Sequence, residues 1–204
     1  MRTRHSSDIN NKSLSFTSYI FNQKDPNSNA NKVLMGGYPS SFNGCGWIAI
    51  YNALISMGKF EHPAEIVKWL VENNGLSFGG AFGVKAKSVE EYFNASGYKA
   101  NIFYKDFETH AKNGDAVVMR YSWYKGGLNY GEHYIAGSYN SQASEYEFYN
   151  VYNNSTGMHP YQDLNAFITD GGKRTISYYN DYTGNIISYD VNKVNIQSVI
   201  VISK

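Results

Sequence analysis

Residues 36–59, GGYPSSFNGCGWIAIYNALISMGK, form the stretch that decides the fold. Between Gly46 and Met57 the apolar side chains point in every direction around a helix, without a polar stripe. A helix that is apolar all round is a buried helix. Gly58 suits the left-handed conformation in which many helices end. We therefore expect a buried helix over residues 46–57, with the only cysteine of the chain, Cys45, at its start.

Further helices are expected around the glycine-rich run LSFGGAFGVKAK, residues 76–87. Residues Pro63–Asn73 begin with proline and end at an Asn-Asn-Gly break, and their apolar side chains lie on one side, as in a surface helix. A short helix is expected from Ser88, where Ser88-Val89-Glu90-Glu91 resembles a capping box. Another is expected over residues 106–111.

The second half of the chain is predicted to form strands. Residues 116–123 alternate as a strand, residues 124–132 are a glycine-rich loop, and residues 133–139 and 146–152 form a hairpin around residues 140–144. After a helix over residues 161–168, three more strands are expected at 174–179, 184–190 and 197–203. Helices followed by an antiparallel sheet indicate the α+β class.

The chain is expected to contain one domain and an arm. Residues 1–32 are rich in Asn and Ser and predict a polar arm or linker, and residues 33–204 form the domain. The arm carries one apolar patch that is able to pack onto the body: Leu14, Phe16, Tyr19, Ile20 and Phe21.

Charge and composition exclude several classes of function. Lys and Arg number 18 against 17 Asp and Glu, so no basic face for nucleic acid is indicated. No run is long and apolar enough to span a membrane, and no spacing of His, Cys and carboxylates suggests a metal or another cofactor. Glu90 and Glu91 are expected on a solvated face. The first thirty residues contain no secretory signal, so the protein either stays inside the cell or has lost a signal.

Cys45 has two interpretations. A lone cysteine on an apolar helix is usually a small core residue. At the start of a helix, however, the unpaired N–H groups and the positive end of the dipole favour a thiolate and lower the thiol pKa. The flanking Gly44 and Gly46 would also let a substrate backbone approach the sulfur.

His133 is the best candidate for a base among the five histidines. It begins an alternating strand after the glycine-rich loop, a place suited to the edge of a cleft. A cysteine nucleophile needs an imidazole of this kind facing it. The alternative is an ordinary histidine at the end of a strand.

An asparagine is expected to orient the imidazole. A hairpin loop centred near residue 143 places His133 opposite residues 152–153, so Asn153 is the first candidate. Asn154 and Asn150 are fallbacks, because the sequence does not fix the register. All three are also typical turn residues.

These segments resemble a known family. The run NGCGWIAIYNAL is similar to the nucleophile helix of papain-like cysteine peptidases, in particular the double-glycine-leader peptidase-like branch. NGDAVVMRY and EHYIAGSYN…YEFYNVYNN resemble the strands around that branch's histidine and Asp/Asn. The resemblance covers residues 36–154. It implies a bacterial peptidase with a papain-like fold, acting on a peptide or protein substrate, with Cys45 as nucleophile, His133 as base and Asn153 as orienter.

One position departs from the family pattern. The family carries a glutamine about six residues before the cysteine that helps to bind the oxyanion, but here Pro39 stands there and no glutamine lies between Leu34 and Cys45. The Cys45 N–H is one expected donor. Asn43 is the favoured second donor, with the side chains of Ser40, Ser41 and Tyr38 as the alternatives.

Three functions remain open from the sequence. The first is a thiol hydrolase that cleaves peptide bonds through an acyl-enzyme. The second is a papain-like acyltransferase or deamidase that acts as a toxin or effector. The third is an inactive binding module on the same scaffold, which the absent glutamine favours.

Overall fold

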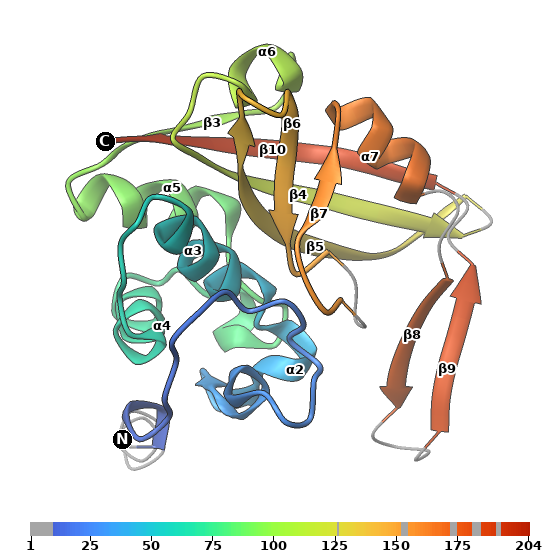
Figure 1. The fold of residues 1–204 in the computed structure, drawn as a ribbon. Coiled ribbons are helices and arrows are strands. Elements are labelled where there is room, and N and C mark those ends of the chain that lie inside the picture. The colour runs from blue at the N-terminus through green and yellow to red at the C-terminus, as the bar shows by residue number, and fades with distance from the viewer. Residues whose placement is uncertain (1–9, 126, 152–154, 172–174, 181–184, 191–192) are drawn as a thin grey trace.

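The computed structural model describes residues 10–125, 127–151, 155–171, 175–180, 185–190 and 193–204. The chain has an α+β fold in which most helices precede an antiparallel sheet, as the sequence predicts (Figure 1). The helices are η1 (Asn29–Lys32), α2 (Ser40–Asn43), α3 (Cys45–Ser56), α4 (Pro63–Glu72), η2 (Ser77–Gly80), α5 (Ala86–Ala95), α6 (Phe107–Ala111) and α7 (Leu164–Gly171).

The main sheet has six strands, and every neighbouring pair is antiparallel. In spatial order they are β3 (Lys99–Phe103), β10 (Lys193–Ser203), β4 (Ala116–Lys125), β5 (Leu128–Asn140), β6 (Glu145–Tyr149) and β7 (His159–Tyr161). Two smaller pairs lie outside it: β1 (Leu34–Met35) with β2 (Tyr38–Pro39), and β8 (Thr175–Asn180) with β9 (Asn185–Asp190).

Alternation along the strands divides the interior into two cores. In β4, Ala116 and Val118 face the core that contains α3. Val117 and Met119 face a second core, together with Phe167 of α7. Successive side chains of a strand point to opposite faces, so this sheet is covered by helices on both sides and both sets of side chains are buried.

Helix α3 is the buried helix that the sequence predicts. Its side chains from Cys45 to Leu54 are buried all round, and it packs against β5 and β4. Two hydrogen bonds of the Ser40 side chain fix the start of α3. The Ser40 hydroxyl donates to the Val33 carbonyl at 2.7 Å and accepts from the Trp47 indole N–H at 2.7 Å. Ser40 is fully buried, so α2 and α3 are tied together at the point where Cys45 stands.

The described part of the arm packs on α3. Leu14, Phe16 and Ile20 join the core around this helix, so the apolar patch docks as the sequence suggests. The Asn52 side chain pairs with both backbone groups of Ile20, accepting from its N–H at 2.9 Å and donating to its carbonyl at 2.9 Å. Residues 10–33 therefore run along the body and bury polar as well as apolar groups.

The glycine-rich loop is much shorter than predicted. Strand β4 runs to Lys125 and β5 begins at Leu128, so most of the expected loop, residues 124–132, pairs across these two strands. The pairing includes an irregularity between Trp123 and Tyr124. Glycines hide the alternation of this stretch, because they add no side chain to either face. His133 consequently lies inside β5 and not at its start.

Other boundaries also differ from the prediction. Helix α5 begins at Ala86, so Ser88 lies inside it and no capping box forms. Glu90 is buried rather than solvated, and its carboxylate accepts from the Ile102 N–H of β3 at 2.9 Å. Strand β6 ends at Tyr149 instead of residue 152, and α7 begins three residues later than expected, after the short strand β7.

Candidate functional site

Cys45 is the first residue of α3 and is 8% exposed. Burial raises the pKa of its thiol from 9.0 to about 11, while N–H groups of Tyr134, Gly46 and Cys45 itself lower it. The Glu132 carboxylate raises it further. The sequence predicted a lowered pKa. That prediction is wrong because the helix start does supply N–H groups to the sulfur, but removal from water outweighs them.

The glycines beside Cys45 do not open a path to the sulfur. A Cβ on Gly44 would lie 2.4 Å from the Ser40 Cβ, and one on Gly46 would lie 2.5 Å from the Val84 Cβ. The space at both glycines is therefore filled by the chain itself. This corrects the interpretation that they make room for a substrate backbone.

His133 is held by a backbone carbonyl. Its Nε2 lies 2.7 Å from the carbonyl oxygen of Asn150, and its ring packs edge-on against Tyr121 at 5.7 Å. A carbonyl oxygen only accepts, so Nε2 carries a hydrogen and donates it. In the neutral ring, Nδ1 is then the basic nitrogen. This tautomer is the one that a general base acting through Nδ1 requires.

Cys45 of α3 lies against β5 beside the residue that follows His133. The sulfur lies at the N–H of Tyr134, the residue after His133. Strand β6 pairs only with residues 136–140 of β5, so the edge of β5 before Ala136 is left to other groups. Tyr134 faces the α3 core, whereas His133 contacts Tyr121 of the second core. The sulfur thus lies one residue along β5 from His133, and the imidazole lies on the other face of that strand.

Asn150 orients the imidazole in the described residues, but not through its side chain. Its carbonyl accepts from His133, while its side chain turns to Gln23. Asn153, the first candidate from the sequence, and Asn154 lie outside the described residues. The observed β5–β6 pairing ends with Ala136 opposite Tyr149, so the predicted pairing of His133 with residues 152–153 also lies outside the described residues.

Asn43, the expected oxyanion donor, is buried in α2. Its Nδ2 donates to the Gly80 carbonyl, and its Oδ1 is buried with no hydrogen-bond partner among the described residues. Ser40, an alternative donor, donates its hydroxyl hydrogen to the Val33 carbonyl. One amide hydrogen of Asn43 is therefore engaged by Gly80 of the glycine-rich run 76–87, and the donors at the sulfur are backbone N–H groups, including that of Cys45 itself.

Gln23 is a site residue that sequence reasoning missed. It is 4% exposed, and its Nε2 lies 3.4 Å from the carbonyl of Ser41, in the helix just before Cys45. Gln23 lies far outside the stretch between Leu34 and Cys45 in which the family pattern places its glutamine. The single signal in the sequence was the apolar patch beside it, which indicated that this part of the arm docks.

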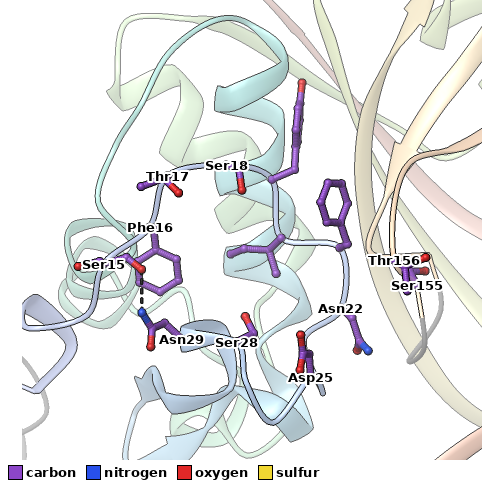
Figure 2. A pocket seen from close by; sticks show the side chains of 13 residues that line it. Ser15, Phe16, Thr17, Ser18, Asn22, Asp25, Ser28, Asn29, Ser155 and Thr156 are labelled. Atoms are coloured by element: carbon purple, nitrogen blue, oxygen red, sulfur yellow. Dashed lines mark hydrogen bonds between the residues drawn. The ribbon is translucent and has the colours of Figure 1, made fainter.

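A pocket of about 420 Å³ lies along the arm, between residues 15–29 and the pair Ser155 and Thr156 (Figure 2). Neither Cys45 nor His133 lines it. In the figure, Ser15 and Asn29 bridge one side through the bond from the Asn29 amide to the Ser15 carbonyl, at 2.9 Å. The pocket marks the groove where the arm crosses the body, apart from the thiol.

Among the described side chains, no three of His, Cys, Asp and Glu gather as a metal ion would require. Within the same part of the chain, no helix combines the length and apolar content needed to cross a bilayer. No protein-family model matches the sequence, and no curated protein matches it.

Proposed function

We propose that the chain is a papain-like thiol hydrolase that cleaves peptide bonds through Cys45 and His133. The observation that carries the proposal is the placement of three groups along the same stretch of β5. They are a sulfur at a helix start beside backbone N–H groups, a histidine one residue away, and a carbonyl that holds this histidine in the Nε2–H tautomer. Nucleophile, base and orienting group are the parts that thiol catalysis needs.

The proposed reaction starts from a neutral pair. With a pKa of about 11, the thiol ionises to only about one part in 10⁴ at pH 7. His133 Nδ1 takes the proton as the sulfur attacks the peptide carbonyl, and the N–H of Cys45 donates to the developing oxyanion. The imidazolium then gives its proton to the leaving amine. Water, activated by the same imidazole, releases the acyl group from sulfur.

Exposed aromatic side chains support a peptide substrate. Phe42 of α2 and the pair Phe78 and Phe82 of the glycine-rich run 76–87 are 68%, 83% and 76% exposed. This run contacts α2 through the Gly80 carbonyl and α3 through Val84, so these rings border the start of α3. Apolar surface of this kind beside a nucleophile suits an extended chain with apolar side chains.

The test is the reaction of Cys45 with iodoacetamide, followed by mass spectrometry from pH 5 to 10, together with cleavage of a mixed peptide library. A buried thiol without a base would react only in proportion to its thiolate, about one part in 10⁴ at pH 7. We expect a rate at least tenfold above that limit, its loss in His133→Ala, and library cleavage that disappears in Cys45→Ala. His110→Ala is the matched control, because His110 stacks on Phe103 away from the site.

A second candidate is an inactive binding module on the same scaffold. The filled space at Gly46, the burial of Cys45 and the engaged amide of Asn43 favour it. Alkylation at the unassisted rate, unchanged in His133→Ala, together with an uncleaved library, would establish this candidate and overturn the hydrolase.

A further inference from the structure

Gln23 and Asn150 form a reciprocal pair between the arm and the end of β6. The Gln23 N–H donates to Asn150 Oδ1 at 3.1 Å, and Asn150 Nδ2 donates to Gln23 Oε1 at 3.2 Å. The two residues are 4% and 2% exposed. A buried amide that loses its hydrogen-bond partner destabilises the folded state, so this pair holds the Asn150 side chain in one orientation.

The pair acts on the group that holds His133. Asn150 has a positive φ of 60°, a conformation in which asparagine is tolerated and which turns the chain out of β6. Its carbonyl direction follows from this conformation, and that carbonyl accepts from His133 Nε2. Fixing the side chain of Asn150 therefore fixes the acceptor that selects the tautomer of His133.

The arm is itself anchored on both sides of the site. Tyr19 stacks on Tyr149 with ring centroids 3.7 Å apart, which clamps the end of β6. Ile20 is bonded to Asn52 of α3 through both of its backbone groups. The segment 19–23 thus bridges the helix that carries the thiol and the strand end that holds the imidazole.

We propose that Gln23 is a positioning residue that sets the tautomer of His133 through Asn150. This inference rests on the proposed function for its consequence in catalysis, but not for the geometry that it describes. The arm is then part of the site, because it contributes the residue that holds the orienting carbonyl.

Two variants remove the pair from opposite sides. Gln23→Met keeps the length of the side chain and the backbone N–H bond to Asn150 Oδ1, but removes the acceptor of Asn150 Nδ2. Asn150→Gly keeps the carbonyl and suits the positive φ, but removes the side chain. Gln142→Met in the exposed hairpin loop is the matched control.

The primary measurement is the ¹⁵N NMR spectrum of the His133 ring, which distinguishes Nε2–H from Nδ1–H directly. We expect a dominant Nε2–H tautomer in the natural chain and in Gln142→Met, and a mixture in Gln23→Met and in Asn150→Gly. The double variant should show the same tautomer mixture as each single variant, because both substitutions break the same Gln23–Asn150 contact. Retention of the Nε2–H tautomer in the folded Asn150→Gly or Gln23→Met protein would overturn the proposal.

Activity separates this inference from the proposed function. If the chain is a thiol hydrolase, kcat for a cleaved library peptide should fall about 10- to 100-fold in both variants, with little change in KM. A natural chain that cleaves nothing but shows the tautomer shift would contradict the hydrolase and leave the role of Gln23 intact. If the natural chain cleaves the library but both variants keep its tautomer and its kcat, the result would support the hydrolase and contradict the role of Gln23.

Discussion

Two opposing local effects determine the pKa of the Cys45 thiol. Three N–H groups stabilise a thiolate, and burial in the α3 core destabilises it by more. The sequence indicates the first effect, because a helix start is visible in a run of apolar residues. It does not indicate the second, because the Val84 side chain that fills the space at Gly46 arrives from a loop almost forty residues away.

This balance predicts a pH-dependent contribution of Cys45 to stability. Its pKa is raised in the folded state, so the contribution is full below about pH 9 and is lost as pH rises through about 11. We expect the free energy of unfolding to fall by about 2–3 kcal/mol more over this range than in Cys45→Ala. Urea unfolding of the natural chain and of Cys45→Ala from pH 7 to 11 measures this difference. The buried tyrosines contribute equally to the two proteins, so an unchanged difference between them would contradict the prediction.

The contact between His133 and the Asn150 carbonyl shows how much of the site a predicted strand register can give. The hairpin pattern predicts a pairing of the two strands, and the structure pairs them from Asn140 with Glu145 to Ala136 with Tyr149. It does not predict that β6 ends at Tyr149 and that Asn150 adopts a positive φ. Among the described residues, the group found at the His133 ring is consequently the main-chain carbonyl of Asn150.

At the scale of elements, the helices that the sequence predicts most accurately are those that their own side-chain pattern defines. Helix α3 has no polar face, and α4 has a proline start and a one-sided apolar pattern, and both lie where expected. Strand β5 was shortened in the prediction because Gly131 and its neighbours carry no pattern. The structure explains that glycine by packing, since a Cβ there would lie 2.4 Å from the ring of Trp123.

Gly46 offers a test of how tightly α3 is packed. In Gly46→Ala the new methyl group meets the Val84 Cβ at 2.5 Å. Overpacking of this kind costs about 1–3 kcal/mol, more than the helix propensity that alanine adds. Thermal unfolding should show a lower Tm for this variant. Gly157→Ala, where a Cβ meets nothing within 4 Å, is the control; equal Tm values for the two variants would refute the packing argument.

At the scale of the whole molecule, the arm joins segments that are distant in sequence. Its apolar patch is visible in the sequence, and three of its five side chains belong to the α3 core. The polar half of the docking is not visible, because Asn52 and Asn150 resemble ordinary polar residues until they are seen to be buried. Composition alone therefore suggests a linker where the fold has a packed segment.

Asn52 tests the contribution of the arm to stability. In Asn52→Ala the N–H and the carbonyl of Ile20 lose their partners. We expect a loss of about 2–3 kcal/mol in the free energy of unfolding and faster amide exchange at Ile20. Asn73→Ala, at the exposed end of α4, should change stability by less than about 0.5 kcal/mol. Unchanged exchange at Ile20 would show that the arm is held by its apolar contacts alone.

The place of β10 in the sheet has a consequence for folding kinetics. It lies between β3 and β4, and it follows the end of β4 by almost seventy residues. On a growing polypeptide, β4 and β5 can pair as soon as they leave the ribosome, whereas β3 has no neighbour in the sheet until residue 203 is made. Contacts so far apart in sequence close slowly. We expect ribosome-bound chains that end before β10 to keep β3 accessible to protease, and chains extended past residue 204 by a linker to protect it.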